Sequence, residues 1–295
     1  MQTHHKVVIF GEMLWDCLPS GPVPGGAPMN VALNLHQLGL EPHLISAVGK
    51  DKDGEKLVNF LNSFGLPTGM IQLHPTQETS RVLVDDSDPE NIKYTIISPV
   101  AWDYIQHNQQ MDQMLANADA FVFGTLAVRN GESLQTLLQL LQQDILRVFD
   151  VNLRPPYDDF LLVEKLLDYT DILKINDDEL KALADYFNLD QDIELVCSYL
   201  VKNYAPQLIC VTLGSKGAAL YFNNKLITHA GYKVKVADTI GAGDAFLSGF
   251  IKCYLEGKAP DQLLDFACKL GAFVAGKEGG TPRYKLSDIE NQFKH

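Results

Sequence analysis

Short apolar runs alternate along the chain with longer segments in which apolar residues recur every three or four positions. The short runs predict strands over residues 7–10, 43–48, 120–123, 147–151, 171–175 and 208–214. The longer segments predict helices over residues 30–38, 51–62, 132–143, 177–187, 192–203, 241–256 and 260–275. This alternation predicts a Rossmann-like α/β fold, in which helices flank a mostly parallel central sheet. Ligands of such folds bind beyond the carboxyl ends of the strands.

Two parts of the chain interrupt this alternation. Residues 12–18 and the pair 80–86 and 91–97 have strand-like patterns, and the run "SDPEN" between the pair is typical of a hairpin turn. These strands, within about 12–18 and 80–98, predict a small accessory sheet or lid. Since no repeat, low-complexity tract or linker divides the chain, we expect a single domain over residues 1–295.

Composition and charge indicate which kinds of ligand and partner the protein binds. The 295 residues are 46% apolar and include 24 basic and 37 acidic side chains, a formal net charge of -13. This charge argues against nucleic-acid and anionic membrane partners, but it leaves room for a local basic site that binds a small phosphate. Five cysteines without a C-x-x-C pair indicate a reducing compartment and no structural metal. Without a signal-like start or a run of roughly 18 apolar residues, we expect a cytoplasmic protein.

The segment "DTIGAGDAFLSGF", residues 238–250, places a glycine turn directly before a helical pattern. Gly241, Ala242 and Gly243 leave backbone N–H groups accessible at the helix N-terminus, which favours an anion-binding hole. Asp244 then lies in the first helical turn, where its ionised carboxylate is able to accept a proton from a hydroxyl. The alternative is a glycine turn in which Asp244 serves helix stability alone.

A second glycine turn runs into a helix in "PGGAPMNVALNLHQLG", residues 24–39. Asn30 falls in the first turn of that helix. Its side chain either caps the helix or presents an amide, both donor and acceptor, to a polyhydroxy ligand.

A third glycine segment, "GAFVAGKE" at residues 271–278, matches G-x-x-x-x-G-K but is not expected to bind phosphate. A P-loop requires Ser or Thr after the lysine and a strand before the glycines, whereas Glu278 follows here and the pattern is helical. We expect Gly276 to end a helix.

Together these segments resemble the two signatures of the ribokinase-like (PfkB) carbohydrate kinases. The N-terminal signature corresponds to "GGAPMNVA" followed by Gly39 and Gly49, and the C-terminal one to "DTIGAGDAFLSG". Family-like motifs lie between them: "GEMLWD", "DVNLR", "KINDDE" and "VTLGSKG". The resemblance covers residues 10–281 and implies a ribokinase-like fold with a β lid and ATP-dependent phosphorylation of a sugar.

The resemblance also implies roles for individual residues at the reacting centre. Asp244 is then the base that deprotonates the sugar hydroxyl, and the glycine turn before it forms the anion hole for the transferred phosphoryl group. Asp16, Gly26 and Asn30 match sugar-binding positions, where a carboxylate and an amide pair with neighbouring hydroxyls. Arg154 closes "DVNLR" and is expected on the substrate side, neutralising phosphate charge, or in a structural ion pair.

The nucleotide end of the site is implied in the same way. Lys174 is expected to neutralise phosphate charge, with a structural ion pair as the alternative. Asn176 and Glu179 match a motif that orders Mg²⁺ and phosphate, with Glu179 acting through water. Thr212 and Gly214 match a strand-end turn that contacts the phosphates of ATP; a turn without a ligand is the alternative. Family members also often use a monovalent cation such as K⁺ near the anion hole.

The acceptor sugar is indicated by finer resemblances. "GE" before Asp16, "GGAPMNVA" and "PVAWDYI" are most similar to the fructokinase branch, which implies the 6-hydroxyl of D-fructose as acceptor. Trp15 and Cys17 depart from that branch, and so does the run "RPPY" that begins at Arg154. The alternatives are a 2-keto-3-deoxygluconate kinase, another sugar kinase of the family, or a non-catalytic sugar- or nucleotide-binding regulator. A homodimer formed through the lid is expected.

Overall fold

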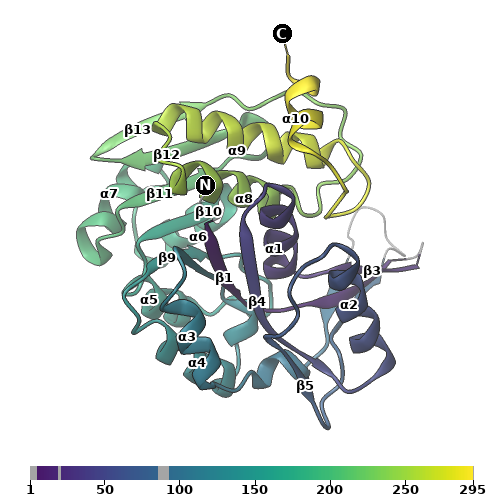
Figure 1. Cartoon of the computed structure of the whole chain (residues 1–295). Coiled ribbons are helices and arrows are strands. Elements are labelled where there is room, and N and C mark those ends of the chain that lie inside the picture. Colours follow the sequence, from purple (N-terminus) through teal and green to yellow (C-terminus); the bar gives the residue numbers. More distant parts are fainter. Residues whose placement is uncertain (1–4, 19–20, 86–92, 295) are drawn as a thin grey trace.

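The computed structural model describes residues 5–18, 21–85 and 93–294, and its strands form two sheets (Figure 1). The large sheet has the strand order β13-β12-β11-β10-β9-β8-β1-β4-β5. The strands from β5 to β11 in this order are parallel, and β12 and β13 add to one edge in antiparallel pairing. Its strands are β1 (Lys6–Phe10), β4 (Glu41–Gly49), β5 (Ile71–His74), β8 (Ala120–Phe123), β9 (Leu146–Asp150), β10 (Ile172–Asn176), β11 (Leu208–Thr212), β12 (Ala218–Phe222) and β13 (Lys225–His229).

Helices cover both faces of the large sheet, so two apolar cores lie against it. On one face lie α1 (Ala27–Gln37), α2 (Lys52–Ser63), α8 (Ala242–Leu255), α9 (Pro260–Ala275) and α10 (Leu286–Gln292). On the other lie α3 (Gln109–Leu115), α4 (Gly131–Leu140), α5 (Phe160–Leu167), α6 (Asp177–Tyr186) and α7 (Ile193–Tyr204), with the 3₁₀ turns η1 (Ala101–Tyr104) and η2 (Leu126–Val128).

Side-chain alternation along the buried strands divides them between these two cores. In β1, Val7 and Ile9 belong to one core, whereas Val8 and Phe10 belong to the other. Both sets are apolar because both faces of a parallel sheet are covered. Among the described residues, we find no helix with the length and apolarity that crossing a membrane requires.

The predicted fold class is confirmed, and all predicted strands and helices are present, with boundaries that shift by a few residues. Four strands escaped the sequence pattern: β3 (Gly21–Gly25), β5, β12 and β13. Strand β3, "GPVPG", contains two prolines that a central strand does not tolerate; it occurs at the edge of the small sheet. Strands β12 and β13 form a hairpin whose turn residues Asn223 and Asn224 have φ of 50° and 57°.

The small sheet has the order β3-β2-β6-β7, with β2 (Leu14–Leu18), β6 (Arg81–Asp85) and β7 (Lys93–Ile96). It contains the strands predicted for the accessory sheet, and β2 and β6 pair in parallel. The predicted turn "SDPEN" lies outside the described residues.

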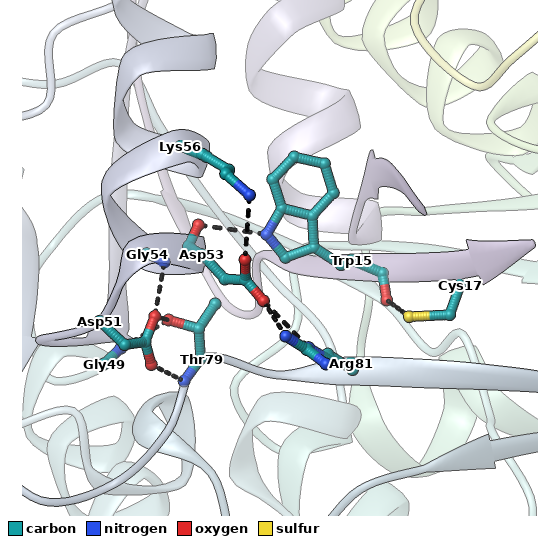
Figure 2. A network of polar contacts seen from close by, with 9 residues as sticks. All are labelled: Trp15, Cys17, Gly49, Asp51, Asp53, Gly54, Lys56, Thr79 and Arg81. Atoms are coloured by element: carbon teal, nitrogen blue, oxygen red, sulfur yellow. Dashed lines mark hydrogen bonds and ion pairs between the residues drawn. The ribbon is translucent and has the colours of Figure 1, made fainter. Parts of the chain in front are cut away.

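The first turn of α2 fixes the small sheet to the body of the protein, as Figure 2 shows. Trp15 on β2 donates its indole N–H to the backbone carbonyl of Asp53 at 3.1 Å. Arg81 on β6 pairs with the carboxylate of Asp53, its Nε lying 3.0 Å from Oδ2. Lys56 lies 3.5 Å from the other oxygen of Asp53. One aspartate therefore contacts two neighbouring strands of the small sheet.

Asp51 caps the same helix and also contacts the segment that leads into β6. Its Oδ1 accepts hydrogen bonds from the backbone N–H of Gly54 at 2.8 Å and from the hydroxyl of Thr79 at 2.7 Å. Its Oδ2 accepts from the backbone N–H of Thr79 at 2.8 Å. Thr79 Oγ1 also accepts a hydrogen bond from the backbone N–H of Gly49, the last residue of β4. Asp51 and Thr79 together therefore connect the start of α2, the end of β4 and the segment before β6.

Asp51→Ala removes two acceptor oxygens and the three hydrogen bonds that they accept, and it leaves both polar groups of Thr79 without this partner. We expect the free energy of unfolding, measured by urea denaturation, to fall by about 2 kcal/mol. Asp192→Ala is the matched control, because the cap of α7 accepts one backbone N–H, that of Leu195, and we expect a loss of about 0.5–1 kcal/mol. Equal losses would contradict a role for Asp51 in anchoring the small sheet.

Candidate active site

A cavity of about 640 Å³ lies between the carboxyl edge of the large sheet and the small sheet. The small sheet contributes Leu14, Asp16 and Leu18 from β2, Val82 from β6 and Ile96 from β7. Ten of the residues predicted for the site line this cavity: Asp16, Gly26, Asn30, Arg154, Lys174, Asn176, Thr212, Gly241, Gly243 and Asp244. The cavity lining does not include the predicted site residues Ala242, Glu179 and Gly214.

The glycine turn before α8 is fixed by the conformation and close packing of Gly241. Gly241 is the N-cap of α8 and has φ 74°, in the left-handed region that favours glycine. A Cβ on Gly241 would lie 2.2 Å from the carbonyl oxygen of Gly280, so the turn also packs too closely for any side chain. Gly243 lines the cavity, whereas the N–H of Ala242 donates to the carbonyl of Thr239 at 3.3 Å.

Asp244 lies in the first turn of α8 and Asn30 in the first turn of α1, so the two helices begin side by side at the cavity. Asn30 Nδ2 donates to Asp244 Oδ2 at 2.8 Å. The side chain of Asn30 is buried, 4% exposed, and its Oδ1 has no hydrogen-bond partner. Asn30 is therefore not the helix cap. Its Oδ1 is a buried acceptor that lies on the same amide as the group bound to Asp244.

The carboxyl of Asp244 is basic for an aspartate. Burial raises its pKa to about 6, and the nearby charge of Asp150 acts in the same direction. Lys174, the hydrogen bond from Asn30 and the charge of Arg154 act to lower the pKa. At neutral pH the group is thus mostly ionised and still a better proton acceptor than a solvated aspartate.

Gly25 and Gly26 leave space for the carboxylate of Asp16 and for the backbone of Glu12. A Cβ on Gly25 would lie 2.1 Å from Asp16 Oδ2, so only glycine leaves room for that side chain. Gly26, with φ 111°, approaches the backbone oxygen of Glu12, which a Cβ would meet at 2.6 Å. Burial raises the pKa of Asp16 to about 6, while Arg154 lowers it.

Glu12 is a cavity residue that the sequence reasoning did not single out. It follows β1, lines the cavity and is 4% exposed. Burial raises its pKa to about 7, against hydrogen bonds from backbone N–H groups, including that of Ala27, and against the charge of Arg154. Its position two residues after the buried strand β1, at the carboxyl edge of the sheet, is the signal that would have identified it.

Lys174 and Asp150 form an ion pair at the floor of the site. Lys174 Nζ lies 2.8 Å from Asp150 Oδ1, and each residue is 5% exposed. Burial alone would lower the pKa of Lys174, but the charges of Asp150 and Glu179 reverse this and raise it. Lys174 therefore does form the structural ion pair considered as an alternative, while its side chain also lines the cavity. Asp150, which opens "DVNLR", was missed.

Asn176 and Glu179 form a capping box at the start of α6. Asn176 Oδ1 accepts from the N–H of Glu179, and Glu179 Oε2 accepts from the N–H of Asn176, both at 2.8 Å. Glu179 Oε1 accepts from the N–H of Leu153, also at 2.8 Å. The glutamate is 4% exposed, and burial raises its pKa, with Lys174 opposing this.

Three further predicted residues differ in their positions. Arg154 is exposed at the cavity, and its charge acts on Glu12, Asp16 and Asp244. Thr212 ends β11, lines the cavity and donates its hydroxyl to the carbonyl of Ile175 at 3.5 Å. Gly214 begins η3 (Gly214–Lys216), with φ 56°.

The third glycine segment, residues 271–278, is helical up to Ala275 as expected, because it ends α9, and Gly276 is the C-cap of this helix.

The structure explains one of the departures from the fructokinase branch, the large side chain of Trp15. Trp15 turns to the face of β2 opposite Asp16 and bonds with α2, so its bulk does not line the cavity.

A family model for pfkB family carbohydrate kinases matches residues 21–285. The chain belongs to this family. A putative sugar kinase of Pyrococcus horikoshii is 30% identical over 275 residues, which cover 88% of this chain and 84% of the relative. Fructokinase-1 of Oryza sativa subsp. japonica is 26% identical over 309 residues, which cover 94% of this chain and 93% of the relative.

Solved structures agree with the family. The structure of an uncharacterized sugar kinase from Pyrococcus horikoshii in complex with ATP superposes with a TM-score of 0.82 at 25% sequence identity, covering 97% of each chain. The family and fold predicted from the sequence are thereby confirmed. The protein is a sugar kinase of the PfkB family, and its candidate active site is the cavity around Asp244.

The raised pKa of Asp244 implies that its ionised carboxylate lowers the free energy of unfolding of the protein without ligand. Because the folded-state pKa, about 6, exceeds the ordinary value of 3.8, the stability that this group contributes is lost as pH rises between these values. Asp244→Asn should therefore raise the free energy of unfolding by about 1–2 kcal/mol at pH 8 and change it little at pH 4. Denaturant melts at both pH values measure this. The exposed Asp261, in the first turn of α9, supplies a matched Asp261→Asn control. A gain at pH 8 no larger than at pH 4 would contradict the argument.

Proposed function

We propose that the protein transfers the γ-phosphate of ATP to a hydroxyl of a small sugar, with the 6-hydroxyl of D-fructose as the leading acceptor and Asp244 as the general base. The observation that carries the proposal is the pair formed by Asn30 and Asp244 at the cavity. The amide of Asn30 orients the Asp244 carboxylate at the cavity through Oδ2, and a sugar hydroxyl beside this carboxylate would donate its one proton to it.

The phosphoryl group is proposed to bind where α8 begins. The N–H groups at Gly241, Ala242 and Gly243 and the helix dipole stabilise negative charge there, and Lys174 adds a positive charge below. The N–H of Ala242 has a partner in Thr239 and would have to exchange it for the ligand. Arg154, exposed at the cavity, contributes charge on the acceptor side.

The remaining predicted residues divide between sugar and nucleotide. Asp16, Gly26 and Asn30 are proposed to bind the sugar. Asn176, Thr212 and Gly214 are proposed to contact the nucleotide together with Lys174, since strands β10 and β11 end beside the cavity.

Magnesium fits the site only with its water shell retained. Both oxygens of Glu179 already accept backbone N–H groups, and the described part of the chain contains no cluster of three or more acidic, His or Cys side chains that holds a metal. Asn176 lines the cavity and Glu179 does not, so we propose that Glu179 acts on Mg²⁺ through water, as suits an ion that dehydrates reluctantly. The ion supplies charge neutralisation to the phosphates. A monovalent cation such as K⁺ near the anion hole stays a prediction.

The cavity favours a neutral sugar over a carboxylate-bearing one. Its described lining includes the acidic side chains of Glu12, Asp16 and Asp244, whereas the cations are Arg154 and Lys174, the latter already paired with Asp150. A 2-keto-3-deoxygluconate kinase would need cations free for the substrate carboxylate. This supports fructose, and an assay with a panel of sugars decides the point.

The small sheet is proposed to act as a lid that closes over the sugar and excludes water. Its inner residues Leu14, Val82 and Ile96 line the cavity, whereas Leu83 is 47% exposed on the outside. The edge strands β3 and β7 of the small sheet support the proposal that a second copy of the chain pairs with the lid.

An ADP-release assay with Mg-ATP tests the function. The acceptors are fructose, ribose, 2-keto-3-deoxygluconate, fructose 6-phosphate and adenosine. We expect fructose-dependent release, and we expect Asp244→Asn to lower kcat by roughly 10²–10⁴-fold with a much smaller change in sugar KM. Asp261→Asn serves as the control and should keep the wild-type kcat.

Each outcome has a distinct meaning. Preference for another acceptor would keep the kinase and reject fructose. Equal kcat in wild type and Asp244→Asn would reject Asp244 as the base. No release with any acceptor, although ATP binds, would favour a non-catalytic binding protein.

A further inference from the structure

The ion pair between Asp150 and Lys174 is built into the sheet directly below the candidate base. Strands β9 and β10 are parallel neighbours, and Asp150 and Lys174 are partners in their register. Their side chains meet at 2.8 Å, and both residues are 5% exposed. Holding two charges away from water is costly unless each has a partner, so the pair is fixed in place.

The lysine of this pair reaches the start of α8. A Cβ added to Gly243 would lie 3.6 Å from Lys174 Nζ, so the ammonium group lies close beneath the turn that carries Asp244. Despite this closeness, the ion-pair partner of Lys174 among the described residues is Asp150 and not Asp244. Asp244 instead receives its hydrogen bond from the neutral amide of Asn30.

We propose that Asp150 is a positioning residue for phosphoryl transfer: it holds the ammonium group of Lys174 on β9, so that this cation does not pair with the carboxylate of Asp244. The inference rests on the proposed role of Asp244 as general base. A carboxylate engaged by a lysine is a weaker proton acceptor, because the ion pair favours its ionised form. The lysine kept by Asp150 still contributes positive potential below the anion hole.

The sign of the effect follows from the charges around Asp244. The charged groups that face Asp244 or Lys174 are Asp150 from β9, Arg154 after β9, Lys174 from β10, Glu179 from α6 and Glu12 after β1. Asp150 acts to raise the pKa of Asp244 and Lys174 acts to lower it. Neutralising Asp150 alone therefore leaves a net positive charge next to Asp244, whereas neutralising both residues restores the balance.

The test compares Asp150→Asn with the double variant Asp150→Asn/Lys174→Met. The midpoint of Asp244 ionisation is followed by ¹³C NMR of labelled aspartate, with the resonance assigned by its loss in Asp244→Asn. We expect Asp150→Asn to lower this midpoint, and the acid limb of the kcat–pH profile, by about one pH unit, and to lower kcat at neutral pH roughly three- to tenfold. The double variant should return the NMR midpoint to near the wild-type value.

The chain offers a matched control between the same two strands. Asp171, just before β10, pairs with Arg147 of β9 at the opposite edge of the sheet, with Nε 2.9 Å from Oδ2. Asp171→Asn should reduce stability and leave the midpoint of Asp244 unchanged. Thermal melts and circular dichroism establish that every variant is folded.

Two results would overturn the inference. One is a folded Asp150→Asn variant whose Asp244 midpoint equals that of the wild type. The other is a lowered midpoint that persists in the double variant, since the cause would then not be the released lysine. A wild-type protein that phosphorylates no sugar would instead reject the proposed function, and it is recognised separately because the NMR titration needs no substrate.

Discussion

The site depends on one constraint: parallel strands end at the same edge of a sheet, and the helices that follow them begin there. Helices α1, α6 and α8 each present their first turn or N-cap to the cavity, through Asn30, Asn176 and Asp244. Each helix start carries a partial positive charge from its unpaired N–H groups. A protein with a formal net charge of -13 thus gains a local environment that suits a triphosphate.

The same edge collects carboxyl groups that are costly to bury. Glu12, Asp16 and Asp244 all have raised pKa values, and in each case burial is the largest cause. A carboxyl group whose pKa is raised by burial destabilises the folded protein at pH values where the group is ionised. Perturbed groups of this kind gather at functional sites, which agrees with the position of all three at the cavity.

Local patterns allowed the helix that carries Asp244 and most strands of the large sheet to be predicted, whereas the capping box of Asn176 and Glu179 emerged from the structure alone. Contacts between distant segments escaped prediction. Asn30 and Asp244 were both named, but their hydrogen bond joins residues 214 positions apart, and no local pattern encodes it. Asp150 was missed because its partner lies on a neighbouring strand, and the burial of Glu12 depends on how the turn at Gly26 packs on its backbone.

Strand β2 separates two tasks by the simple alternation of its side chains. Leu14, Asp16 and Leu18 face the cavity, whereas Trp15 faces α2 and holds the small sheet in place. Substitutions at the first set would change the wall of the cavity, while substitutions at Trp15 would change the contact between the small sheet and α2. The shape of the cavity and the attachment of the small sheet therefore depend on alternate positions of a single five-residue strand, so that either is open to change without the other.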